Sequence, residues 1–177
     1  ASLMFTAALG QLVTGSEMME ETGRDFLTRD HPYVPYVAMM LYARIASADT
    51  QQEARGVLTE RWEKADRPHW KQRLQGGDET AWREMLIGLY LDELKPQEIF
   101  DPLKDDESFA KSDLHFLPMS RQEMLCEAYF YSALLAESKK DMQARDADLR
   151  KVVDTKVVYF TEYAMAKYML SQRTSAS

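Results

Sequence analysis

The chain has 177 residues, a net charge of −7 and a sequence pI near 5.0. Its length suits one domain with a real core, or a short array of repeats. No block of Lys and Arg stands apart from the acidic balance, which argues against nucleic acid as the main partner, because phosphate binding needs a concentrated basic surface. No apolar run reaches membrane-spanning length, and the single cysteine excludes an intrachain disulfide and a cysteine-based zinc site.

The composition favours helices over sheets. Glycine (7) and proline (6) are scarce and asparagine is absent, so the residues that build hairpin turns are few. Good helix formers such as Ala, Leu, Glu and Lys are abundant. The 11 methionines suit either a helical core or an adaptable binding groove.

The first half of the chain is predicted to hold four helices and a short helical piece. Ser16 is the expected N-cap of the second helix, and Pro32 and Pro35 prevent it from continuing. Asp49 or Thr50 is expected to cap the fourth helix. The predicted ranges are 2–14, 17–28, 34–47 and 51–65, with the short piece at 67–75.

The second half is predicted to hold five more helices. Asp78 or Thr80 starts the first of them, and Ser120 caps the longest. Residues 104–118 form the longest irregular loop, and residues 173–177 are expected to be a disordered tail. The predicted ranges are 81–93, 95–103, 121–138, 140–153 and 156–171.

The segment "KVVDTKVVYFTEYAMAKYML", residues 151–170, poses a local conflict. Its first part is rich in β-branched and aromatic residues, which favour a strand, but no other segment offers a partner strand. We therefore expect residues 152–153 to finish one helix and Thr155 to cap the next. The residues sharing one face of that helix would be Val157, Phe160, Ala164 and Tyr168.

Helix pairs recurring at about 30–45 residues suggest a helical-repeat array rather than a compact bundle. The tetratricopeptide (TPR) pattern places small residues where two helices approach closest. Positions that fit the pattern include Ala8, Gly15, Pro32, Ala54, Trp82, Gly88, Tyr131 and Ala144. The predicted fold is all-α: a TPR-like right-handed solenoid of antiparallel helix pairs with a C-terminal capping helix. It forms a single domain over residues 1–172, with degenerate units at 1–33, 34–66, 79–104 and 119–154 and a capping helix at 156–171.

The order of these units is similar to the C-terminal two-thirds of the "new lipoprotein I" type of bacterial TPR lipoprotein. The resemblance lies in "HPYVPYVAMMLYARI", "TAWREMLIGLYLDELKPQEIF" and the joint from Val152 to Ala164, where "F-x-E-(aromatic)-x-A" is Phe160, Glu162, Tyr163 and Ala164. The chain departs from the family at 67–80, where it carries extra residues, and it lacks the family's N-terminal repeats and lipid-bearing cysteine. The resemblance implies a periplasmic, membrane-tethered adaptor of Gram-negative bacteria that dimerises and presents cell-wall hydrolases to a carboxy-terminal processing protease.

In a TPR solenoid, the first helix of each pair lines a concave groove. Aromatic and Met side chains there would suit helical or extended peptide ligands. Packing between repeats is an equally good interpretation of each of these residues. The candidate groove residues are Phe5, Leu9, Tyr36, Met39, Met40, Trp82, Met85, Tyr129 and Phe130.

No catalytic, cofactor-binding or metal-binding pattern stands out. His31, His69 and His115 have no His, Cys or carboxylate at metal-ligand spacing. Cys126 lies inside a predicted helix, where an inert buried thiol is expected rather than a nucleophile. We expect no enzymatic activity and no cofactor.

The sequence thus predicts a protein-binding scaffold that takes a protein or peptide ligand, with no nucleic-acid partner and no membrane span. Two other interpretations remain open: a self-associating oligomerisation module, including a homodimer, and a helical accessory domain of a larger enzyme. The periplasmic location comes from the resemblance alone, and a cytoplasmic location stays open.

Overall fold

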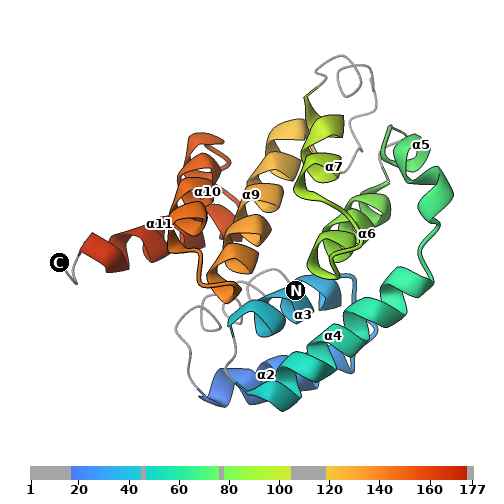
Figure 1. Ribbon diagram of the computed structural model, residues 1–177, viewed down its shortest axis with the longest axis horizontal. Coiled ribbons are helices and arrows are strands. Elements are labelled where there is room, and N and C mark those ends of the chain that lie inside the picture. Colours follow the sequence, from blue (N-terminus) through green and yellow to red (C-terminus); the bar gives the residue numbers. More distant parts are fainter. Residues whose placement is uncertain (1–16, 45–46, 76–77, 105–118, 175–177) are drawn as a thin grey trace.

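The computed structural model describes residues 17–44, 47–75, 78–104 and 119–174 (Figure 1). Every regular element in these ranges is helical, which confirms the all-α prediction. The predicted helix at 2–14 lies outside the described residues. The α-helices are α2 (Glu17–Leu27), α3 (Val34–Arg44), α4 (Ala48–Glu63), α5 (Trp70–Gln75), α6 (Glu79–Tyr90), α7 (Pro96–Phe100), α9 (Arg121–Ser138), α10 (Met142–Asp154) and α11 (Thr161–Thr174). Short 3-10 turns, η1 (Arg67–His69) and η2 (Asp101–Leu103), precede α5 and follow α7.

Several helices begin where their capping residues predict. Ser120 and Glu123 form a reciprocal capping box at the start of α9, in which the Ser120 hydroxyl accepts from the Glu123 amide at 3.3 Å. The Asp78 carboxylate accepts from the Thr80 amide at 2.8 Å and caps α6. At α4 the predicted caps, Asp49 or Thr50, were two or three residues late, because the Ser47 hydroxyl accepts from the Thr50 amide and caps the helix instead.

The joint between α10 and α11 is a helix–turn–helix, as predicted, but α11 starts later than expected. Thr155 is the C-cap of α10 rather than the N-cap of α11, since its hydroxyl donates to the Val152 carbonyl at 2.6 Å. A turn follows in which Lys156 has a φ of 58°, and α11 begins at Thr161. Val157 and Phe160 therefore belong to the turn and not to the predicted helix face.

Neighbouring helices pack in pairs. The most extensive contacts join α9 to α10, α3 to α4 and α10 to α11. Helix α3 also packs against α9, and both contact α6. In a linear array each helix pair contacts only the next pair, so the α3–α9 contact is not one that such an array predicts. The helical elements establish the all-α class, while the TPR-like solenoid order remains a prediction.

The core is built from large aromatic and Met side chains of α3, α6 and α9. Trp82, Tyr90, Tyr131 and Met39 are among the largest side chains that are fully buried. At Gly88 in α6 a Cβ would lie 2.7 Å from Cη2 of Trp62 on α4, so the absence of a side chain lets the indole approach the helix backbone.

Candidate functional site

Most side chains predicted to line a groove lie in the core. The buried ones are Tyr36, Met39, Met40, Trp82, Met85 and Phe130. Tyr129 is half-buried and stacks on Phe100 with ring centroids 4.8 Å apart. Phe5 and Leu9 lie outside the described residues. The six buried side chains take part in helix packing, which is the alternative that the sequence left open. Their burial does not test whether the protein binds a partner.

A buried carboxyl group, that of Glu127 on α9, lies at the centre of this core. Its Oε2 accepts hydrogen bonds from the Tyr36 hydroxyl of α3 at 2.9 Å and from Trp82 Nε1 of α6 at 3.0 Å. Three helices are therefore tied to one oxygen atom. Because buried polar groups cost stability unless they are hydrogen-bonded, this arrangement favours one packing of α3, α6 and α9 over others.

A second buried carboxyl, that of Glu162 on α11, extends the cluster. It accepts from the Tyr131 hydroxyl of α9 at 3.3 Å. Removal from water, followed by the negative charge of Glu162, raises the pKa of Glu127 well above its usual range. Burial likewise raises the pKa of Glu162. Both residues are only 7% exposed, so the pair is part of the interior.

The sequence analysis missed this pair. Glu162 was noted only within the family-like joint, and Glu127 received no role. A signal was present, because Glu127 falls on the helix face that carries Met124, Phe130 and Tyr131. A carboxylate on the apolar face of a helix is a sign of a buried polar group.

A second polar cluster joins the ends of α3 and α9 to α10. Glu137 Oε2 lies 3.4 Å from Arg44 Nε, and Glu137 Oε1 lies 4.0 Å from Arg145 Nη1. Arg145 Nη2 also donates to the Met169 carbonyl of α11 at 3.3 Å. Burial lowers the pKa of Arg44. Asp146 Oδ1 also lies 3.8 Å from Arg145 Nε, so two carboxylates accompany the two partly buried guanidinium groups, which fits a structural role at this end of the core.

A surface pocket of about 290 Å³ opens between α3, α4 and α6. Pro32 and Pro35 border it at the start of α3, and Arg61 and Lys64 come from the end of α4. The sequence analysis did not single out this pocket, because its residues come from three separate helices. We refer to it below as the cationic pocket.

Helix α6 supplies the third side of the cationic pocket with Thr80, Arg83, Glu84 and Ile87. These positions are spaced i, i+3, i+4 and i+7, so they share one helix face. Arg83 is mostly buried, with 16% of its side chain exposed, and Ile87 is almost fully buried, with 1% of the residue exposed. The pocket thus combines cations with apolar surface.

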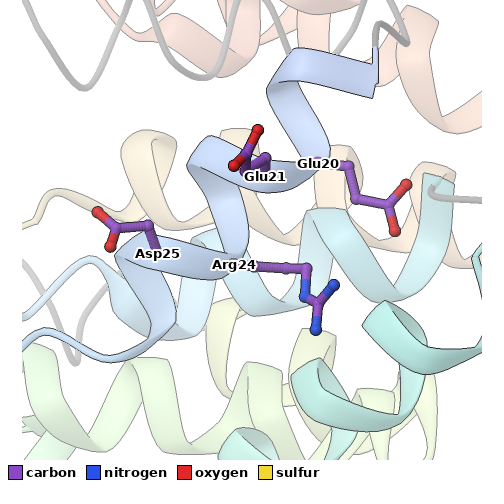
Figure 2. Close-up of a pocket in the computed structure, with 4 residues that line it drawn as sticks. All are labelled: Glu20, Glu21, Arg24 and Asp25. Atoms are coloured by element: carbon purple, nitrogen blue, oxygen red, sulfur yellow. The ribbon is translucent and has the colours of Figure 1, made fainter.

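A larger pocket of about 550 Å³ runs along α2, where the described lining residues are Glu20, Glu21, Arg24 and Asp25 (Figure 2). Most of these side chains already have partners. Arg24 Nε donates to Glu53 at 2.8 Å, and Glu20 accepts from the Thr50 hydroxyl. Asp25 pairs with Arg29 at 2.8 Å. Among these described residues, Arg24 and Asp25 are already in ion pairs, which leaves them less available to a charged ligand.

Cys126, His31 and His69 lie within the described residues. Cys126 is buried, and burial raises the pKa of its thiol to about 12. His31 accepts from the Tyr33 amide at 3.2 Å, and His69 Nδ1 lies 2.9 Å from Asp66. His115 lies outside the described ranges. No cluster of three His, Cys, Asp or Glu side chains suited to a metal occurs in the part of the chain that the structure describes.

The turn between α10 and α11 presents two large apolar side chains to solvent. Val158 is 65% exposed and Tyr159 is 73% exposed, whereas Val157 beside them is buried. The Tyr159 hydroxyl donates to Glu123 Oε1 at 2.9 Å, which fixes the ring over the start of α9. We refer to Val158 and Tyr159 together as the exposed turn.

Comparison with protein-family models, curated proteins and solved structures finds no match to the chain. The likeness to TPR lipoproteins therefore rests on the sequence patterns alone. Among the described helices, none has both the length and the apolar character needed to cross a membrane.

Proposed function

We propose that the protein is a protein-binding scaffold, and that in the cell envelope it acts as an adaptor that brings substrates to a processing protease or cell-wall hydrolase. The envelope setting and the kind of partner come from the family resemblance. The observation that carries the binding role is the exposed turn, with Val158 and Tyr159 projecting into solvent.

The exposed turn has the properties of an interface anchor. Tyrosine is enriched at binding hot spots because it adds a large contact area with few rotatable bonds. The hydrogen bond from Tyr159 to Glu123 restricts the side chain before a partner arrives, which lowers the entropy lost on binding. The turn itself is held by the Val158 amide, which donates to the Lys156 carbonyl at 2.9 Å.

The test is affinity capture from a Gram-negative envelope extract, followed by titration with the purified captured protein. We expect the native chain to retain a protease or hydrolase, and the double variant Val158→Ser/Tyr159→Ser to bind it at least about tenfold more weakly. Tyr168→Ser is the matched control, because Tyr168 is another exposed tyrosine, at 44%, on α11.

Retention of no specific partner, or equal retention by the double variant, would count against the proposal. Sedimentation of the same proteins tests the alternative that the chain binds a second copy of itself. A dimer that the double variant breaks and the control leaves intact would assign the exposed turn to a second copy of the chain. Substitutions at Tyr36 or Trp82 are unsuitable here, since both side chains are buried and would report on folding.

A further inference from the structure

We propose that the cationic pocket binds a side-chain carboxylate from an acidic peptide segment of a protein partner, with an adjacent apolar side chain of that segment packed against the pocket's proline and isoleucine side chains. The inference rests on the proposed scaffold function, since its ligand is a protein segment. It uses a different surface from the exposed turn and can be tested with synthetic peptides alone.

The first support is the charge balance of the pocket. Among the described lining residues the carboxylate is that of Glu84, which is already paired with Arg73, whose Nη1 lies 2.7 Å from Glu84 Oε2. Arg61 makes no salt bridge among the described residues, and Lys64 pairs only with Glu60, an exposed contact that solvent weakens. The pocket therefore carries excess positive charge on a chain with a net charge of −7, and this local potential attracts anionic groups.

The second support is the setting of Arg83. Its nearest acidic partner, Glu79, is 3.7 Å away, and its hydrogen bond to Thr80 Oγ1 is 3.3 Å long. Both contacts are longer than the 2.7–2.9 Å typical of a charge-assisted hydrogen bond. A mostly buried guanidinium with such partners retains donors for a carboxylate, which matches its planar fork.

The third support is the shape and the apolar surface. A volume of about 290 Å³ is at the small end of ligand sites and holds one or two side chains rather than a cofactor. Pro32 is exposed and provides most of the apolar contact, beside the buried Pro35 and Ile87 that also line the pocket. Proline is rigid, so little entropy is lost when it is covered. A carboxylate next to an apolar side chain satisfies both halves of the pocket, whereas a free inorganic anion satisfies only one.

Fluorescence anisotropy tests the proposal with a labelled short peptide of alternating Glu and Leu, acetylated and amidated at its ends. Its isosteric counterpart replaces every Glu by Gln. We expect the Glu peptide to bind at least about tenfold more tightly than the Gln peptide, and to weaken as salt rises from about 50 to about 300 mM. A second Gln peptide with a free C-terminal carboxylate tests whether the bound carboxylate comes from a chain terminus or from a side chain.

Arg61→Gln and Arg83→Gln should each weaken binding of the Glu peptide about tenfold, whereas Arg150→Gln should not change it. Arg150 is exposed on α10, which lines no part of the pocket. Thermal unfolding of each variant verifies folding, and Arg61 tests the pocket independently if Arg83→Gln unfolds.

Equal binding of the Glu and Gln peptides, or equal loss in Arg150→Gln, would overturn the proposal. The proposal would also be overturned if inorganic phosphate displaced the labelled Glu peptide at the same concentration as unlabelled Glu peptide does. That result would indicate a simple anion site. Tighter binding of the Gln peptide with a free C-terminus than of the Glu peptide would also overturn the proposal. That result would indicate recognition of a terminal carboxylate. The probes are synthetic, so the pocket is tested separately from the scaffold role. If the Glu peptide bound as expected but the affinity capture retained no protein, the scaffold role would be refuted and the proposal for the pocket would stand.

Discussion

Two glycines in helix interiors allow one substitution to be tested in opposite environments. Gly56 in α4 and Gly88 in α6 both pay the helix penalty of glycine, which is about 1 kcal/mol relative to alanine. A Cβ at Gly56 would meet nothing within 4 Å, so Gly56→Ala should recover that stability in full. For a chain of this size the gain should raise Tm by about 2–4 °C.

The same change at Gly88 should be destabilising. The new Cβ would lie 2.7 Å and 2.8 Å from ring carbons of Trp62 and 2.8 Å from Cδ1 of Leu94, all closer than atoms can pack. Overpacking of this kind costs about 1–3 kcal/mol, and the Trp62 indole is held in the core. After the helix gain is subtracted, we expect Gly88→Ala to lose up to about 2 kcal/mol relative to the wild-type chain and to lie about 1–3 kcal/mol below Gly56→Ala.

Urea and thermal unfolding followed by circular dichroism measure both variants under the same conditions. The wild-type chain and Gly56→Ala serve as the two references. If Gly88→Ala proved as stable as Gly56→Ala, then Trp62 would not pack against this turn of α6, and the described contact between α4 and α6 would be wrong.

Three further predictions concern the buried carboxyl, a helix cap and the cysteine. Glu127 faces Tyr36, Arg83 and Glu162, and its pKa is raised in the folded state. The folded state therefore binds more protons than the unfolded state, so the free energy of unfolding should fall as pH rises above about 4.5. Glu127→Gln should flatten this fall in urea titrations between about pH 5 and 8, and an unchanged slope would contradict the assignment. Ser120→Ala removes the cap of α9 and should cost about 1 kcal/mol in the same assay, a loss that Ser120→Asp should largely avoid. Cys126 should react with a thiol reagent at the rate of global unfolding, and rapid labelling of the native protein would show that the thiol is accessible.

The helix boundaries that the sequence predicted best depend on short-range chemistry. Ser120 and Glu123 are three residues apart, so their capping box can be recognised without knowledge of the fold. Thr155 was misassigned for a related reason. A threonine hydroxyl can cap the next helix or bond back to the preceding one, and only the structure shows that it bonds to Val152.

The groove residues and the buried carboxyl depend on long-range contacts. Periodicity places Trp82 and Met85 on one helix face, but it does not say which neighbour covers that face, and the α3–α9 contact was not foreseen. Likewise, Glu127 becomes a core residue only because Tyr36 and Trp82 reach it from distant segments. The cationic pocket has the same origin, since its three walls meet only in the folded chain.

The position of Arg83 joins the surface to the interior. Its positive charge lowers the pKa of Glu127 and so opposes the rise caused by burial, while its side chain also lines the cationic pocket. An anion bound at Arg83 would cancel part of that charge and favour protonation of Glu127. Ligand binding and protonation of Glu127 would then favour each other, in the pH range where Glu127 titrates.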